Sequence, residues 1–229
     1  MEKIEKYIGY EFKDRSFLQT ALTHSSYANE NKLPAFSYNE RLEFLGDAIL
    51  GFVVGSYVFK HYSDIPEGEL TKLRASVVCE AMLAKKAKNI ELGSFLRLGK
   101  GEEMTGGRNR ISILADAFEA LIGAIYMDGG IENAEKFILT QLENDIKLMR
   151  VGFKKLDSKT NLQEIIQKTS KIPLEYHIID EKGPAHNRTF SASVTHNGVV
   201  LGVGSGSSKK DAEQAAAQAA IEKLEAQNV

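Results

Sequence analysis

Residues 39–50, NERLEFLGDAIL, set acidic side chains into an otherwise apolar segment. Glu40, Glu43 and Asp47 stand at offsets of zero, three and seven, which places them on one face of a helix. The nearly uninterrupted apolar run Ala48–Phe59 is well short of the roughly 20 residues that a membrane-spanning helix needs. The segment therefore predicts a buried core helix with a row of carboxylates.

A second apolar segment, residues 113–124, carries Asp116 and Glu119 three positions apart, again on one helical face. Carboxylates within apolar helices are costly to desolvate unless they are paired, and Arg41 is the one cation at a matching spacing. Hard oxygen ligands suit Mg²⁺. Two facing helices would therefore form a metal cage, in which the metal orients and activates a water for phosphodiester hydrolysis.

The alternative for either acidic pair alone is a solvated edge of an amphipathic helix, which is where most Asp and Glu side chains lie. Two pairs in helices as apolar as these favour the metal site. Gly46 and Gly123 adjoin the pairs and would allow the helices to approach closely, although a glycine in a helix can also have no structural role.

The composition indicates two globular domains, with 229 residues of which 43% are hydrophobic. The net charge of −2 argues against a domain that attracts nucleic acid over its whole surface, so any RNA binding must come from local clusters. The N-terminal stretch MEKIEKYIGYEF lacks the apolar region of a signal peptide, which predicts a cytoplasmic protein. Cys79 has no cysteine partner and is expected to be a buried, inert thiol.

The pattern from Ile4 to about Met149 is helical throughout, because apolar residues recur at helical spacing without strand-like alternation. Glycine, proline and polar residues interrupt it at four places and predict six or seven helices. These breaks fall at Asn29–Pro34, Ser63–Gly68, Leu98–Arg110 and Asp128–Gly130. We assign residues 1–150 to this all-α domain and residues 151–156 to a linker.

Residues 157–229 have a different pattern, with a helix over Lys159–Ser170 and a closing alanine-rich helix from Lys209 to about Ala226. Asn197-Gly198 is a strong signal for a two-residue hairpin turn. Between the helices, three segments rich in β-branched and aromatic residues predict strands, at Leu174–Asp180, Thr189–Thr195 and Val199–Val203. The order α-β-β-β-α, with both helices on one sheet face, predicts a small α+β domain.

The segment at 39–50 resembles, without a substitution, the most characteristic motif of the bacterial ribonuclease III family. ALTHSSY at 21–27, EGELTKLR at 67–74 and GKGEEMTGGRNRISILAD at 99–116 also look like their family counterparts. The C-terminal module resembles a double-stranded RNA-binding domain. The resemblance implies an all-α ribonuclease III endonuclease domain, residues 1–150, followed by a double-stranded RNA-binding domain, residues 157–229.

By this resemblance the four acids of the active site are Glu43, Asp47, Asp116 and Glu119, which are all metal ligands, with Asp47 and Glu119 as the catalytic residues. The implied cofactor is Mg²⁺, with Mn²⁺ as a substitute, and no organic cofactor. The implied activity is cleavage of double-stranded RNA by a homodimer, in rRNA and mRNA processing. It leaves 5′-phosphate and 3′-hydroxyl ends with short 3′ overhangs. Phe44 has two open roles, a dimer contact or core packing within the subunit.

The resemblance also implies three RNA-contacting patches, carried by Thr160 and Gln163, by His186, and by Ser208, Lys209 and Lys210. The two lysines lie in the first turn of a helix, where the macrodipole disfavours cations by roughly 0.3–1 kcal/mol each. A bound phosphate would reverse that penalty, and exposed helix-start amides would add donors. Short polar side chains such as Gln163 suit the wide minor groove of A-form RNA. Taken singly, Gln163 and His186 are better explained as solvated surface residues, but their occurrence together with Lys209 and Lys210 favours RNA contact.

Three function classes remain open. A metal-dependent processing endonuclease is favoured by the complete set of acids. A non-cleaving regulator that binds duplex RNA would keep the fold without the chemistry. A phosphohydrolase of small nucleotides would have no use for the C-terminal module. Cations near the acids could contact the RNA backbone or be solvated surface charges, namely Lys72, Arg74, Arg97, Arg108 and Arg110.

Overall fold

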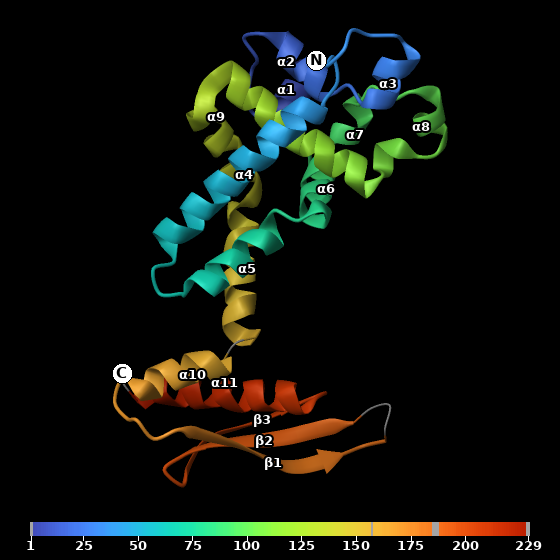
Figure 1. Cartoon of the computed structure of the whole chain (residues 1–229). Coiled ribbons are helices and arrows are strands. Elements are labelled where there is room, and N and C mark those ends of the chain that lie inside the picture. The colour runs from blue at the N-terminus through green and yellow to red at the C-terminus, as the bar shows by residue number, and fades with distance from the viewer. Residues whose placement is uncertain (1, 157, 185–187, 228–229) are drawn as a thin grey trace. The chain divides into compact units, whose positions relative to one another are not determined.

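The computed structural model describes residues 2–156, 158–184 and 188–227 (Figure 1). The chain forms two compact units, Met1–Met149 and Arg150–Val229. Residues 151–156, which the sequence assigns to a linker, continue a long helix, α9, as far as Leu156. The boundary between the units therefore falls within a helix rather than in an irregular segment.

The described part of the first unit is all-helical, as the sequence predicts. It has more helices than the six or seven expected, because short helices form within the loops, above all in the glycine-rich stretch around residues 98–110. The elements are α1 (Glu2–Ile8), α2 (Arg15–Ala21), α3 (Ser25–Glu30), α4 (Glu40–His61), α5 (Glu67–Val77), α6 (Glu80–Asn89), α7 (Leu92–Phe95), α8 (Lys100–Met104), the 3₁₀ helix η1 (Gly107–Asn109) and α9 (Ile111–Leu156).

Helix α9 is divided by Gly130, whose φ of 78° and ψ of −178° are not helical. This break falls within the predicted interruption at residues 128–130. Asp128, just before it, accepts hydrogen bonds from the Tyr10 hydroxyl (2.6 Å) and from the backbone amides of Lys13 (2.9 Å) and Asp14 (2.8 Å). These contacts fix the segment between α1 and α2 against the bend, and they hold the pKa of Asp128 below its usual value although its partial burial acts in the opposite direction.

Helix α4 is buried along one side only, so the prediction of a fully buried core helix was wrong for its other side. Ile49, Leu50 and Val53 lie in the core, whereas Phe44, Phe52 and Phe59 are 80%, 65% and 72% exposed. By length and composition alone, α4 would be able to cross a membrane, but the core helix of a soluble protein meets the same criteria.

Cys79 also departs from its expected environment. It precedes α6 as the N-cap residue, is exposed, and donates from its thiol to the Ser76 carbonyl oxygen. The apolar neighbours in sequence lie on α5 and α6, whereas Cys79 occupies the turn between these two helices. The expectation of a buried thiol was therefore wrong.

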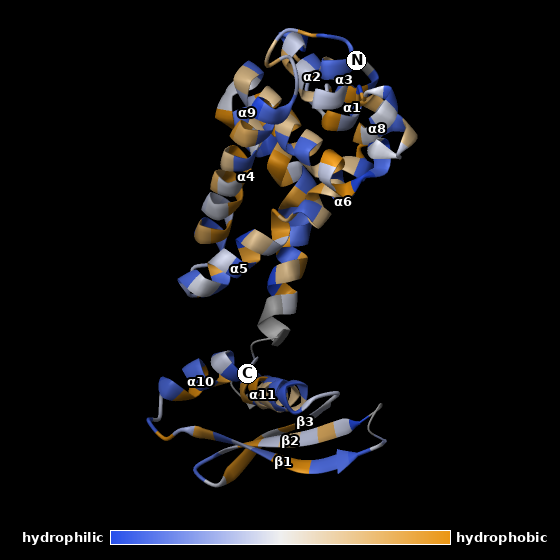
Figure 2. Cartoon of the chain, turned by 45° about the vertical axis from the view of Figure 1, so that its right-hand side comes forward, coloured by the Kyte–Doolittle hydropathy of each residue, from blue (hydrophilic) through white to orange (hydrophobic). Residues whose placement is uncertain are grey.

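The second unit has the predicted order, with α10 (Ser158–Gln167), β1 (Leu174–Lys182), β2 (Thr189–His196), β3 (Val199–Gly206) and α11 (Lys209–Gln227). The strands form an antiparallel sheet in the order β1-β2-β3. Asn197 and Gly198, with φ of 50° and 76°, form the tight turn between β2 and β3. Both helices cover the same face of the sheet, as Figures 1 and 2 show.

Small residues at the contact of α11 with β3 bring the helix close to the sheet. Ala216 and Ala220 of α11 are fully buried. Side chains added at Gly202 or Gly204 of β3 would overlap the backbone of α11, so the helix lies directly on this strand. Alanine therefore serves two purposes in α11, since it favours the helix and permits the short distance to the sheet.

Candidate active site

Helices α4 and α9 touch backbone to backbone beside the acidic residues. A methyl group on Gly46 would overlap the carbonyl oxygen of Glu119 and lie 3.1 Å from the Gly123 nitrogen. A methyl group on Gly123 would overlap the carbonyl oxygen of Leu42. Both glycines are thus required by the close approach of the helices, which is the role that the sequence suggested for them.

Three of the four predicted acids meet across this contact. Glu43 of α4 and Asp116 and Glu119 of α9 each offer a carboxylate oxygen, and these oxygens lie within 4.8 Å of one another. All three side chains are partly buried. Asp47 is exposed and outside this group, because it lies four residues, roughly 6 Å, further along α4 than Glu43.

Asp47 nevertheless belongs to the same electrostatic environment. Burial, followed by the charges of Asp47, Glu43 and Asp116, raises the pKa of Glu119 to about 8. Burial and the neighbouring acids also raise the pKa of Glu43, with Asp116 as the largest of these charges. Glu43 and Glu119 therefore resist carrying their charges at the same time in the absence of a cation.

Two residues that approach Asp116 were not predicted as part of the site. The pKa of Asp116 is raised by burial and then by Glu80 at the start of α6, and His24 partly offsets these effects. His24 belongs to the ALTHSSY segment, which the sequence marks only by its resemblance, and Glu80 has no motif to mark it. Both lie far from Asp116 in sequence, so spacing alone gives no signal for either.

The donor set fits a hard divalent cation. Glu43, Asp116 and Glu119 offer only oxygen ligands, which Mg²⁺ and Mn²⁺ accept. Among the ion pairs of the described residues, none joins a lysine or arginine to these three acids or to Asp47. The repulsion raises the pKa values of Glu43, Asp116 and Glu119 and is offset only in part, by His24 at Asp116. A metal ion would supply the charge that no lysine or arginine of the described ion pairs supplies.

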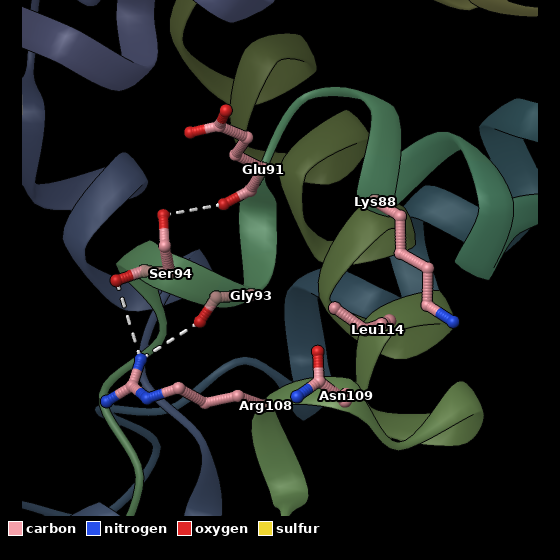
Figure 3. Close-up of a pocket in the computed structure, with 7 residues that line it drawn as sticks. All are labelled: Lys88, Glu91, Gly93, Ser94, Arg108, Asn109 and Leu114. Carbon is pink, nitrogen blue, oxygen red and sulfur yellow. Dashed lines mark hydrogen bonds between the residues drawn. The ribbon is translucent and has the colours of Figure 1, made fainter.

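The arginines of the neighbouring loops have structural contacts. Arg108 donates to the carbonyl oxygens of Gly93 (2.9 Å) and Leu96 (2.8 Å) and pairs with Glu103 (2.6 Å). Figure 3 shows its guanidinium directed at the backbone of Gly93 and Ser94, where it links α7 to η1. Arg108 therefore braces the loop, which leaves its guanidinium less free for RNA.

Arg97 and Arg110 are engaged in the same way. Arg97 lies over the ring of Tyr27, 4.3 Å from its centroid, and donates to its hydroxyl at 3.0 Å. Arg110 pairs with Glu102 at 2.5 Å. Lys72 and Arg74 are exposed on α5.

Five of the six predicted RNA-contacting residues lie in the described part of the second unit. Thr160 and Gln163 are exposed on α10. Ser208 caps α11 by accepting from the Asp211 amide at 3.1 Å, and the exposed Lys209 and Lys210 follow it. His186 lies outside the described residues.

The fold and the site define a helical nuclease domain joined to a duplex-binding domain, and comparisons with known proteins give the family. Residues 14–146 match the Ribonuclease-III-like family, and residues 158–224 match the double-stranded RNA binding motif. The chain is 51% identical to Ribonuclease 3 of Caldanaerobacter subterraneus subsp. tengcongensis over 96% of each chain. It is 47% identical to that of Listeria monocytogenes over 97% of each.

The first unit also resembles a solved structure, the nuclease domain of ribonuclease III from Campylobacter jejuni. The identity is 45% and the TM-score is 0.58, with 62% of this chain and 96% of that one covered. The chain belongs to the ribonuclease III family and is an enzyme with a nuclease domain and a double-stranded RNA-binding domain.

Replacing Gly46 by alanine should push α4 away from α9 and separate the acids. A displacement of about 1 Å at a reacting centre can reduce a rate about 100-fold, so we expect Gly46→Ala to lower the rate of duplex RNA cleavage by about that factor. Gly68→Ala in α5 is the control, because its added methyl group meets no atom within 4 Å. Equal activity of the two variants would show that the helix contact does not set the site.

The raised pKa of Glu119 predicts a pH-dependent loss of stability without metal. Between pH 4.5 and about 8 the folded state retains a proton that the unfolded state releases, so stability falls as pH rises through this window. In EDTA, the melting temperature of the wild type should fall more between pH 5 and pH 8 than that of Glu119→Gln. Parallel curves for the two proteins would contradict the assignment.

Proposed function

We propose that the chain hydrolyses phosphodiester bonds of double-stranded RNA in a reaction that depends on Mg²⁺, for which Mn²⁺ can substitute. The observation that carries the proposal is the meeting of Glu43, Asp116 and Glu119 across the contact of α4 and α9, with no ion pair to a lysine or arginine among the described residues. The ion would activate a water and stabilise the leaving oxygen.

The residues of the chain have separate roles in this proposal. Glu43, Asp116 and Glu119 hold the ion, and the buried position of Glu119 makes its charge the most dependent on metal. Asp47 is the fourth acid, exposed to solvent and close enough to raise the pKa of Glu119. We assign catalysis to Asp47 and Glu119.

We also propose a homodimer, in which two copies cut opposite strands and leave 5′-phosphate and 3′-hydroxyl ends with short 3′ overhangs. The exposed phenylalanines of α4 support this, since large exposed apolar patches mark interaction surfaces. Phe44, at 80% exposure, does not pack in the core of its own subunit, which favours the dimer contact. The nuclease domain of the Campylobacter jejuni enzyme has a structurally flexible region that is involved in dimer formation.

The second unit would hold the duplex by its shape. Thr160 and Gln163 on α10 suit the 2′-hydroxyls of the minor groove, and Lys209 and Lys210 at the start of α11 suit phosphates. Contacts of this kind read little sequence. The proposed cellular role is processing of rRNA and mRNA in the cytoplasm, with no membrane partner and no organic cofactor.

A non-cleaving regulator of duplex RNA is the second candidate. It would require the nuclease fold without a competent site, whereas here the acids converge and their pKa values are strongly perturbed, as is typical of catalytic groups. A phosphohydrolase of small nucleotides is disfavoured by the double-stranded RNA binding motif at residues 158–224.

Glu119→Gln tests the active-site assignment. The amide preserves the shape of the side chain but removes its charge, so Mg²⁺-dependent cleavage of a long RNA duplex should fall at least about 100-fold while duplex binding and the dimer mass are retained. Glu135→Gln, at an exposed position on the same helix, is the control and should cleave normally. Undiminished cutting by Glu119→Gln would remove Glu119 from the reaction. Single-stranded RNA and DNA duplex serve as substrate controls.

Replacing Lys209 and Lys210 together by alanine tests the helix-start contact. Each phosphate contact contributes about −0.9 to the slope of log affinity against log salt, so the double variant should have a slope flatter by about one to two and weaker binding to duplexes of any sequence. Lys223→Ala, near the other end of α11, is the control. If the slope of the double variant stays at the wild-type value, the lysines do not contact phosphate.

A further inference from the structure

Asn39 is a buried polar residue whose side chain is unused by the protein. It is 3% exposed and precedes α4, where its backbone amide donates to the Thr23 carbonyl and its own carbonyl accepts from the Glu43 amide, both at 2.9 Å. Its side chain does not cap the helix, and it has no hydrogen-bond partner among the residues that the structure describes. Among the described residues, the fully buried side-chain atoms without a partner belong to Glu102 and Tyr176, so the unpaired Asn39 carboxamide keeps access to solvent and is available to a ligand.

His24 is held in a fixed orientation beside it. Its Nδ1 accepts from the Ser26 amide at 3.2 Å and lies 2.8 Å from the Ser26 hydroxyl, and its backbone amide donates to the Arg97 carbonyl at 3.1 Å. Because Nδ1 is an acceptor in this arrangement, Nε2 carries the ring proton and is a donor. Within residues 2–156, 158–184 and 188–227, Nε2 has no hydrogen-bond partner.

Both side chains belong to the surroundings of the acids. The hydrogen bond between Thr23 and Asn39 places His24 next to the start of α4, one turn before Glu43. The effect of His24 on the pKa of Asp116 agrees with this position, although burial and Glu80 have larger effects on that carboxyl. The Asn39 carboxamide and the His24 imidazole thus lie near the start of α4, next to the carboxylate cluster.

A carboxamide suits this place for an electrostatic reason. A lysine or arginine here would pair with the acids and compete with the metal, whereas an amide can bind RNA without neutralising them. The nearby Arg97, Arg108 and Arg110 already have contacts within their loops. A carboxamide both donates and accepts, as does a ribose 2′-hydroxyl, and the imidazole N–H can donate to a phosphate oxygen.

We propose that Asn39 and His24 form a ribose–phosphate subsite beside the acids, in which the Asn39 carboxamide binds a 2′-hydroxyl and the Nε2–H of His24 donates to an adjoining phosphate oxygen. This inference rests on the proposed function and deepens it. The subsite lies in the nuclease unit, so it gives that unit its own means of selecting RNA over DNA at the position of cutting.

A 2′-deoxy scan tests the Asn39 contact. RNA duplexes with a single 2′-deoxy nucleotide at each position around the cleavage site are cut by the wild type and by Asn39→Ala under single-turnover conditions. At one position, the deoxy substitution should slow cleavage by the wild type about tenfold. Asn39→Ala should cleave the all-ribose duplex about tenfold more slowly than the wild type, and the same deoxy substitution should not slow it further. The ratio of ribose to deoxy rates is taken within each protein, so partial misfolding of a variant cancels. The proposal would be overturned if, at every position, the deoxy substitution slowed Asn39→Ala by the same factor as the wild type.

Two substitutions of His24 separate the capping role of its Nδ1 from the donor role of its Nε2. His24→Asn keeps an acceptor for the Ser26 amide but removes the donor at Nε2, whereas His24→Gln places an amide nitrogen near Nε2. We expect His24→Asn to cleave about tenfold more slowly with an unchanged melting temperature and His24→Gln to retain most of the activity. A His24→Gln variant as impaired as His24→Asn would overturn the role of Nε2.

The affinities of the wild type and Asn39→Ala for the same deoxy-substituted duplexes are measured in EDTA by fluorescence anisotropy. Coupling between Asn39 and one 2′-hydroxyl should appear there as well, because neither group requires the metal. If the wild type did not cleave the all-ribose duplex with Mg²⁺, the proposed function would fail while this binding measurement still decided the subsite. Absence of coupling in a wild type that does cleave would overturn the subsite alone.

Discussion

Gly46 of α4 lies against the carbonyl oxygen of Glu119, and Gly123 of α9 lies against that of Leu42, with no side chain between the two backbones. Other features of the nuclease unit follow from this contact. It brings acids from two distant segments within 4.8 Å of one another, and it buries them enough to raise their pKa values. Any larger residue at either glycine would relax both effects, because the helices would separate by the width of a methyl group.

Much of this could be predicted from the sequence, since the acids recur at helical spacing in two segments and glycines adjoin them. The exposure of one side of α4 could not be predicted from the sequence. Phe52 and Phe59 are as apolar as Val53 and Val58, so composition does not distinguish the buried side from the exposed one. The environments of Asn39 and His24 were also beyond prediction, because a single histidine or asparagine has no spacing to mark it and its neighbours come from other parts of the fold.

The second unit was predicted more fully because its determinants are local. Asn197-Gly198 sets the hairpin, and the alanines of α11 set the helix. The direct contact of α11 with β3 depends on Gly202 and Gly204 meeting those alanines, which only the structure shows. With a net charge of −2 for the whole chain, affinity for RNA must depend on where a few groups stand rather than on overall attraction.

The exposed phenylalanines of α4 have a consequence for a newly synthesised monomer. Until the proposed homodimer covers that side, Phe44, Phe52 and Phe59 present a surface to which other incompletely folded chains can adhere. On that proposal, the yield of soluble protein depends on how quickly copies meet after synthesis, and truncated or mismatched copies would act as seeds for aggregation.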